Sequence, residues 1–239
     1  GNIIRWEYSY SGGDPWTPIA HTSAIYNFTN LSGSISFRAI VQVPANLPAT
    51  SSVIRVNVYQ TSLGGTISGA SEVCQNTNYS YTLSGNRGKV LNWEQSTNGG
   101  STWTAVVQSM DSTILSRSFT QNTIYRSNVK NGACPVVSSP SLMITAYQTS
   151  VSGSISGTDS VCKSGNTVNL NLGGSVGTNY SWQTSLNPNG SWTVVGNNST
   201  VFSTSNLENT SFYRVSVKNG ACPESTSGVY KVAVSQVSN

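Results

Sequence analysis

The chain has 239 residues with a formal net charge of +4, and charged side chains make up only 8% of it. An average globular domain contains roughly 25% charged residues, and helix-rich enzymes and coiled coils depend on Glu, Lys and Arg, so this composition disfavours both. Aromatic residues reach 9%, which argues against charge-driven disorder. One histidine and eight acidic residues leave little material for histidine-based metal sites or acid–base catalysis.

The chain offers no pattern for binding nucleic acid or for entering a membrane. Its twelve basic residues are scattered rather than clustered, so we expect no nucleic-acid partner. No apolar run approaches the ~18 residues that span a bilayer, so we expect no membrane insertion by this segment. Residues 1–6 indicate the start of a strand and not a signal peptide, and we expect the chain to be a piece of a longer protein.

An internal repeat of about 88 residues is the main feature of the sequence. Cys74 lies 88 residues before Cys162, and Cys134 lies 88 residues before Cys222. The matching text is direct, since residues 65–69 (GTISG) recur at 153–157 (GSISG) and residues 129–135 (VKNGACP) recur unchanged at 217–223.

A third copy at the start of the chain is shorter. Trp6 and Trp16 each lie 87 residues before their counterparts, Trp93 and Trp103, and Asn46 stands where the second cysteine would be. We therefore predict a partial repeat lacking its N-terminal strands at 1–60 and full repeats at 61–148 and 149–239.

Each repeat has the pattern of β-strands. Tyr213, Val215 and Val217 alternate with polar residues, as expected for a half-buried strand. Gly/Asn-rich turns between such stretches indicate hairpins, and no segment keeps a helical period. We predict an all-β fold of tandem Ig-like β-sandwich repeats. By the same alternation the first tryptophan of each copy belongs to the core: Trp6, Trp93 and Trp182.

Two cysteines in each full repeat suggest disulfide bonds and an oxidising compartment. Cys74 and Cys134 are 60 residues apart, as are Cys162 and Cys222, so we predict one bond within each repeat. Closing a 60-residue loop is worth roughly 4 kcal/mol in the chain-entropy estimate. Zinc is the competing interpretation, but the chain has no CxxC motif and no histidine near either pair.

Three pairs of residues are expected to meet on the solvent face of neighbouring strands. Each pair joins the residue after the first tryptophan to an arginine on the late strand: Glu7 with Arg38, Glu94 with Arg126, and Gln183 with Arg214. Exposed pairs contribute about 0–1 kcal/mol, so they would set register more than stability.

The second tryptophan of each copy admits two interpretations. Trp16, Trp103 and Trp192 each begin the second strand of a hairpin. An exposed indole could stack on the apolar face of a sugar, which makes these residues candidate carbohydrate contacts. Packing within the hairpin is the alternative, and recurrence in all copies favours it.

Other candidates for chemistry are weak. Residues 173–177 (GGSVG) match G-x-S-x-G, but we expect a turn between strands rather than the strand and helix that a nucleophile elbow needs. The three aspartates are too far apart to indicate a calcium site: Asp14, Asp111 and Asp159. His21 is expected to be a surface or loop residue without a partner. We expect no cofactor, no metal site and no catalytic residue.

The repeat unit resembles Ig-like repeats in very large surface proteins of Bacteroidetes. The motif runs from Trp93-Glu94-Gln95-Ser96 through Trp103 to Val106, and then from Tyr125-Arg126 to Pro135. It is similar to repeats of the gliding-motility adhesin group, of which SprB is the type. This resemblance implies export by the type IX route and a place on the cell surface, and it supplies no binding residues.

The resemblance gives meaning to a second short pattern. Asp111-Ser112-Thr113 and Asp159-Ser160-Val161 fit the Asp-Ser/Thr-X sequence that some Bacteroidetes O-glycosylate on exported proteins. Ser112 and Ser160 are therefore candidate O-glycosylation sites, with a plain turn as the alternative in each case.

The sequence thus favours a structural and adhesive function. We predict a segment of a long cell-surface adhesin for attachment and gliding, acting by reach and by many weak contacts. Its partners would be a cell-surface or outer-membrane anchoring protein and polysaccharide or glycan surfaces. The alternative is a carbohydrate-binding or spacer module of a secreted polysaccharide-active enzyme. An enzyme in its own right would need catalytic groups that this composition scarcely contains.

Overall fold

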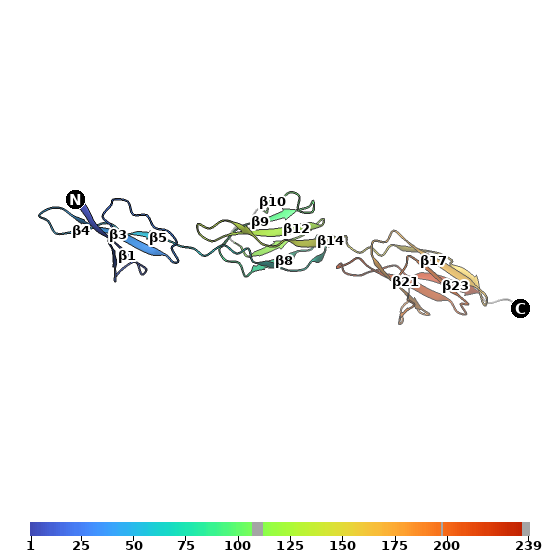
Figure 1. The fold of residues 1–239 in the computed structure, drawn as a ribbon. Coiled ribbons are helices and arrows are strands. Elements are labelled where there is room, and N and C mark those ends of the chain that lie inside the picture. Colours follow the sequence, from blue (N-terminus) through green and yellow to red (C-terminus); the bar gives the residue numbers. More distant parts are fainter. Residues whose placement is uncertain (107–111, 197, 236–239) are drawn as a thin grey trace. The chain divides into compact units, whose positions relative to one another are not determined.

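A computed structural model describes residues 1–106, 112–196 and 198–235. Every regular element in this described part is a β-strand (Figure 1). The chain forms two compact units, one of residues 1–64, 86–89 and 129–138 and the other of the remaining residues.

The first repeat forms a single sheet. Its strands are β1 (Asn2–Ser9), β2 (Thr17–Ile19), β3 (Ile35–Gln42), β4 (Ala49–Thr50) and β5 (Ile54–Val56). The sheet has the order β2-β1-β3-β4, and β5 also pairs with β3. Glu7 lies opposite Arg38 in the antiparallel β1–β3 ladder.

The second repeat has two sheets. Strands β6 (Thr66–Ser68), β8 (Tyr79–Ser84) and β11 (Ile114–Arg117) form the smaller one. The larger one has the order β10-β9-β12-β14-β7, with β13 (Val137–Ser138) beside β12. Its strands are β7 (Glu72–Cys74), β9 (Lys89–Ser96), β10 (Thr104–Ala105), β12 (Thr123–Lys130) and β14 (Leu142–Tyr147).

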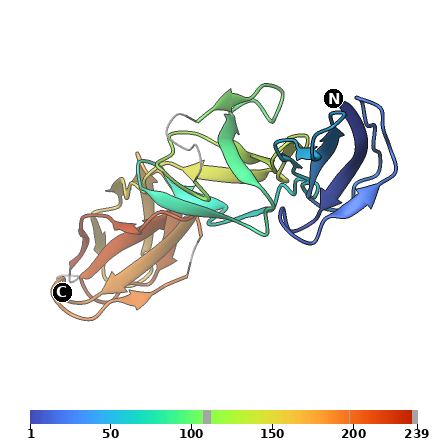
Figure 2. The same ribbon diagram turned by 90° about the vertical axis from the view of Figure 1, so that its left-hand side faces the viewer.

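The third repeat has the same plan, visible in orange and red in Figure 2. Strands β15 (Ser154–Gly157), β17 (Thr167–Gly173) and β20 (Val201–Ser205) form the smaller sheet. The larger sheet has the order β16-β23-β21-β18-β19, with β22 (Ser225–Thr226) beside β21. Its strands are β16 (Ser160–Cys162), β18 (Asn179–Ser185), β19 (Thr193–Val194), β21 (Ser211–Lys218) and β23 (Tyr230–Ser235).

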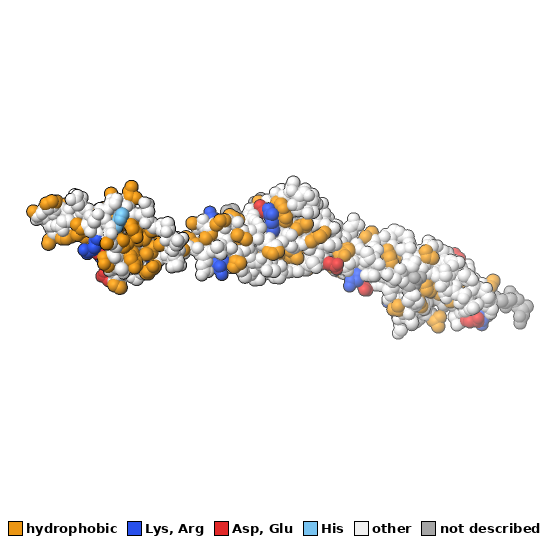
Figure 3. Space-filling view, viewed as in Figure 1, with side chains coloured by type: hydrophobic (Ala, Val, Ile, Leu, Met, Phe, Trp, Pro, Cys, Tyr) orange, Lys and Arg blue, Asp and Glu red, His pale blue; other side chains and the backbone are white. Residues whose placement is uncertain are grey.

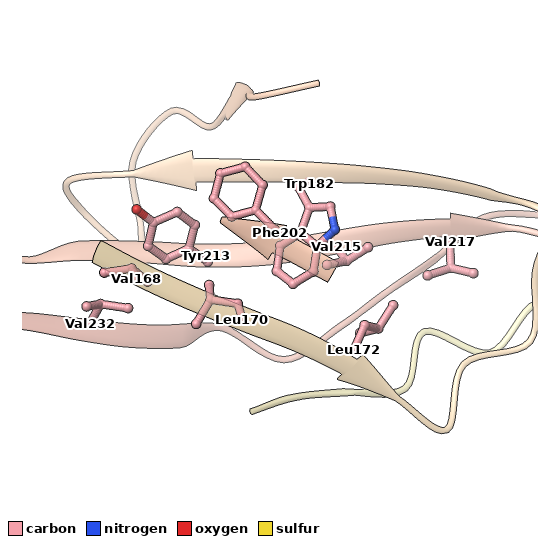
Figure 4. Close-up of a cluster of buried hydrophobic side chains, with 9 residues drawn as sticks. All are labelled: Val168, Leu170, Leu172, Trp182, Phe202, Tyr213, Val215, Val217 and Val232. Atoms are coloured by element: carbon pink, nitrogen blue, oxygen red, sulfur yellow. The ribbon is translucent and has the colours of Figure 1, made fainter. Parts of the chain in front are cut away.

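Alternation along the strands places the core where the sequence predicts it. The side chains of β21 alternate between buried and half-buried, and Tyr213, Val215 and Val217 are buried. They pack with Trp182, which is 0% exposed, and with residues of the facing sheet such as Leu170 (Figure 4). Trp93 is likewise 0% exposed in the second repeat. Burial of such large apolar side chains is the main source of stability in each sandwich.

The prediction of a core position is wrong for Trp6, which is only half-buried. Its indole stacks on Tyr26 at 6.0 Å between ring centroids and donates a hydrogen bond to the Ser23 carbonyl oxygen. A segment without strands, residues 20–34, supplies these contacts in place of a second sheet. Figure 3 shows hydrophobic side chains gathered around the single histidine on this part of the chain. The cover is incomplete, since Phe28 remains 41% exposed.

Candidate functional site

A disulfide bond joins the second repeat to the third. Cys74 and Cys222 are bonded with a Cα–Cα distance of 4.7 Å, although they are 148 residues apart in sequence. Cys134 and Cys162 have free thiols. The predicted bonds within each repeat, Cys74 with Cys134 and Cys162 with Cys222, are therefore wrong.

The direction of one short strand explains this pairing. In the third repeat β16 runs parallel to the last strand β23, which places Cys162 opposite Ser235. Cys222 follows the far end of β21, whose first residue, Ser211, pairs with Val232 of β23. The eight residues of β21 span about 26 Å at ~3.3 Å per residue, whereas a disulfide needs a Cα separation below about 7 Å. The two cysteines of one repeat therefore lie at opposite ends of it.

The bonded cysteines meet beside the linker between the second and third repeats. Cys74 ends β7 and lies opposite Tyr147, the last residue of β14. The turn that carries Cys222 lies against the same linker. There the backbone nitrogen of Asn219 donates to Ser150 Oγ at 3.0 Å. Asn219 Nδ2 donates to the Gln148 carbonyl oxygen at 2.8 Å. We call this set of contacts among residues 147–150, 219–222 and Cys74 the interdomain joint.

A second recurring arrangement places an arginine between an acidic or amide side chain and a tryptophan. Arg126 Nε donates to Glu94 Oε2 at 2.7 Å, and its guanidinium carbon lies 4.1 Å from the centre of the Trp103 ring. The first repeat repeats this with Glu7, Arg38 and Trp16, also at 2.7 Å and 4.1 Å. In the third repeat Arg214 Nε donates to Gln183 Oε1 at 2.6 Å, and the guanidinium carbon of Arg214 lies 4.3 Å from the centre of the Trp192 ring. These contacts confirm that all three predicted pairs meet, but the expected exposure on the solvent face is wrong for Glu7, which is buried.

The two glutamates that bind these arginines, Glu7 and Glu94, differ in burial. The side chain of Glu7 is only 6% exposed and also accepts a hydrogen bond from Arg5 Nε at 2.7 Å, whereas the side chain of Glu94 is 19% exposed. Burial alone would raise the pKa of Glu7, but the adjacent Arg5 and Arg38 outweigh it and hold the pKa below its ordinary value.

Each second tryptophan is half-buried, and an arginine covers one face of its ring. The sequence indicated the tryptophans and the arginines separately but not their contact. Their contact with carbohydrate stays a prediction, which now concerns the ring face and edges that the guanidinium leaves open.

A hollow opens between the sheets of the third repeat. It has a volume of about 490 Å³, and Phe202, Leu207 and Tyr213 line its apolar side. Hydroxyl and amide groups line the rest, among them Thr184, Asn187, Ser191, Thr193, Thr204 and Ser211, and no charged side chain takes part. Burial raises the pKa of Tyr213, although Thr184 and Ser211 partly oppose it by hydrogen bonding.

The second and third repeats carry different side chains around this position. In the second repeat the ring of Phe119 packs edge-on against Tyr81 at 5.8 Å and Tyr125 at 6.0 Å. In the third repeat Leu207 stands at the position of Phe119 and Leu170 at that of Tyr81, whereas Phe202 replaces Leu115, so this region has one ring fewer than in the second repeat. The sequence contained this difference between copies, and Leu207 is the replaced residue that lines the hollow.

The remaining candidates lie apart from these features. Residues 173–177 join β17 to β18, so a strand rather than a helix follows the G-x-S-x-G sequence, as predicted. Ser112 is half-buried and bonds Ile114 through its hydroxyl, whereas Ser160 is exposed and donates to Asp159 at 2.9 Å. Their O-glycosylation stays a prediction, and Asp111 lies outside the described residues.

The single histidine lies in a loop, as predicted, but the prediction that it has no partner is wrong. His21 is half-buried, its Nε2 lies 2.7 Å from the Ile25 carbonyl oxygen, and its ring packs 5.2 Å from Tyr26. Among the residues that the structure describes, no three His, Cys, Asp or Glu side chains gather into a possible metal site. No described helix is long and apolar enough to cross a bilayer.

Paired sheets repeated along the chain, with a disulfide between consecutive repeats, define tandem Ig-like β-sandwich domains. The chain belongs to the family described as "Domain of unknown function (DUF8696)", whose model matches residues 63–148 and 151–236.

Two solved structures are similar to the chain at low sequence identity. One contains the FN1–FN3 domains of chicken CNTN1, with 13% identity, a TM-score of 0.36, and coverage of 97% of this chain and 91% of that chain. The other contains extracellular domains 3–5 of Drosophila OTK, with 12% identity, a TM-score of 0.49, and coverage of 98% and 86%. The comparison with curated proteins finds no match.

Proposed function

We propose that this chain is a non-catalytic, force-transmitting segment of a long cell-surface adhesin. The observation that carries the proposal is the Cys74–Cys222 bond, which joins consecutive domains across their linker. A pull on the two ends of the chain would pass through this bond, so the 148-residue stretch that it closes would not extend. A disulfide is also typical of an oxidising, extracellular setting.

The resemblance to the gliding-motility adhesins of Bacteroidetes extends this proposal. On that basis the parent protein is exported by the type IX route, is held by an outer-membrane or cell-surface anchoring protein, and serves attachment and gliding. Many weakly binding domains on one long chain gain avidity without strong individual contacts.

Force spectroscopy on the full chain tests the mechanical part. Opening the bond should release 148 residues, or about 50 nm of additional contour length at ~3.5 Å per residue. We expect that increment for Cys222→Ser and for the reduced chain, and not for the oxidised chain. Equal contour lengths with and without the bond would contradict force transmission through it.

A peptide map of the native parent tests its location and class. Intact cells digested from outside, without reductant, should release the linked Cys74 and Cys222 peptides from a parent with many such domains. Release only after cell lysis, or a parent of ordinary size with a catalytic domain, would overturn the adhesin proposal.

The hollow in the third repeat favours a second function, binding of a neutral saccharide. A lining that combines apolar side chains with hydroxyl and amide groups, and has no charge, matches the apolar face and hydroxyls of a sugar ring. Ser191 and Thr193 of the lining flank Trp192, so binding should change its fluorescence.

The test titrates the full chain with neutral polysaccharides. Leu207→Phe restores the ring present as Phe119 in the second repeat and should abolish the fluorescence change, while Trp103→Ala, in the other repeat, should preserve it. Loss in Trp103→Ala with retention in Leu207→Phe would instead place the sugar on the tryptophans.

A further inference from the structure

The linker between the first and second repeats carries the same contacts as the interdomain joint. The backbone nitrogen of Asn131 donates to Ser62 Oγ at 2.9 Å, and the side-chain Nδ2 of Asn131 donates to the Gln60 carbonyl oxygen at 2.8 Å. The corresponding distances for Asn219 are 3.0 and 2.8 Å. This linker is therefore organised as an interdomain joint, although no disulfide is present in it.

The free thiol of Cys134 occupies the position that Cys222 has in the bonded joint. Cys134 Sγ lies 3.6 Å from the Tyr59 carbonyl oxygen and 3.3 Å from that of Gln60. For Cys222 the distances to Tyr147 and Gln148 are 3.5 and 3.2 Å. The turn thus holds its cysteine in the same place whether or not a partner is bonded.

The free thiol of Cys162 occupies the position that Cys74 has. Cys162 ends β16 opposite Ser235, as Cys74 ends β7 opposite Tyr147, and both strand pairs are parallel. The next amide continues the match, since Lys163 donates to the Ser235 carbonyl oxygen at 2.9 Å and Gln75 to that of Tyr147 at 2.8 Å. Cys162 is exposed.

We propose that Cys162 is one half of a further interdomain disulfide, and that its partner is the turn cysteine of another domain of this family. The partner segment is an Asn-Gly-Ala-Cys turn such as residues 219–222. Gln236 and Ser238 repeat, in sequence, Gln148 and Ser150, the linker residues that bind Asn219 in the bonded joint. Because Cys134 occupies the position of Cys222, its partner by the same reasoning is a cysteine at the end of a strand equivalent to β7, as Cys74 is.

The bond forms by thiol–disulfide exchange with a small disulfide such as oxidised glutathione. The Cys162 thiolate attacks one sulfur of the oxidant, forms a mixed disulfide and releases one glutathione thiol. The turn cysteine, as thiolate, then attacks Cys162 Sγ and releases the second glutathione thiol. Two thiols are oxidised, one disulfide is reduced, and their two protons pass to the two glutathiones.

The inference rests on the equivalence of the joints and not on the adhesive function, so its test is independent of any adhesion assay. The chain up to Ser238 is extended by a second copy of residues 151–235 that carries Cys162→Ser, so that only one Cys162 is present, and is folded in a glutathione redox buffer. Iodoacetamide then blocks free thiols, and a non-reduced peptide map identifies the bonds. We expect Cys162 linked to the turn cysteine of the added copy and complete loss of its alkylation.

The bond between Cys74 and Cys222 in the same molecules reports that the original joint has folded. Cys222→Ser in the added copy alone should make Cys162 alkylatable again. A second extension, with residues 63–147 in place of 151–235, repeats the measurement with the turn of Cys134. Alkylated Cys162 in both extended chains while Cys74–Cys222 is intact, or a bond from Cys162 to Cys222 of its own domain, would overturn the proposal.

Discussion

The ring of Tyr147 lies directly against Gly220, so that a Cβ at this glycine would come within 2.5 Å of three ring carbons. Gly220 also has φ of +50°, a left-handed conformation that other residues adopt at a cost. Tyr59 and Gly132 repeat the contact, with distances of 2.4 Å and φ of +54°. Both requirements explain why a glycine stands in the turn at each joint.

Replacement of this glycine should loosen the interdomain joint. We expect Gly220→Ala to lower stability by more than the ~1 kcal/mol typical of a left-handed position, because the tyrosine ring must also move. Urea unfolding of the full chain measures this loss of stability. The rate at which dithiothreitol reduces the Cys74–Cys222 bond should rise.

The matched control is Gly165→Ala. Gly165 has φ of +66° and nothing within 4 Å of an added Cβ, so it measures the backbone cost alone. Equal losses for the two variants, with unchanged reduction rates, would show that the tyrosine contact contributes nothing.

Loss of the disulfide should destabilise the second and third repeats together. A loop of 148 residues corresponds to about 5 kcal/mol of lost unfolded-chain entropy, an upper estimate. Cys222→Ser should therefore lower their unfolding midpoints and increase protease cleavage in the linker at residues 148–150. Cys162→Ser, which removes a free thiol, should change neither; a chain that tolerates Cys222→Ser equally well would contradict the estimate.

Gln183 in the third repeat stands beside Arg214 where the first two repeats have a glutamate beside the arginine. A substitution can supply the missing carboxylate. Gln183→Glu should form an ion pair with Arg214 and add up to ~1 kcal/mol at low salt, because exposed pairs are weak. At 1 M salt the Debye length is about 3 Å, so the gain should disappear.

Glu94→Gln is the reciprocal variant. It should lose a similar amount at low salt and little at high salt, as measured by thermal unfolding of the full chain. A gain for Gln183→Glu that persists at high salt would indicate hydrogen-bond geometry rather than charge.

High pH should destabilise the second repeat. Burial, and next the neighbouring Tyr125 and Tyr79, raise the pKa of Tyr81 from its ordinary value of 10.0 to about 12. The unfolded chain therefore releases the Tyr81 proton at lower pH than the folded chain does. Stability should be unaffected below pH 10 and fall as the pH rises from 10 toward 12.

Tyr81→Phe should flatten this decline, although it also removes the 2.9 Å hydrogen bond to the Ala70 carbonyl oxygen. That loss should cost about 1 kcal/mol at pH 8. Urea unfolding at a series of pH values measures both effects, with Tyr10→Phe as the control at a ring that is 61% exposed. An unchanged slope for Tyr81→Phe would contradict the assignment.

The sequence by itself determined the repeat, the strand type of its elements and most of the core. Period-two alternation carries that information, because Tyr213, Val215 and Val217 must share one face of a strand whatever it packs against. The arginine pairs were also predictable, since residues that follow recurring tryptophans keep their register across recurring strands. The half-buried state of Trp6 was not, because its environment depends on an irregular segment without a pattern.

Only the tertiary structure decided which cysteines meet. Equal spacing in the two repeats is compatible with bonds inside a repeat and with bonds between repeats, because both preserve the 88-residue period. The pairing of the cysteines depends on two parallel strand pairs, β7 with β14 and β16 with β23. Because of them, the first cysteine of each full repeat lies at the C-terminal end of that repeat. A disulfide forms only between sulfurs that the fold brings within bonding distance, so Cys74 bonds the turn of the next domain.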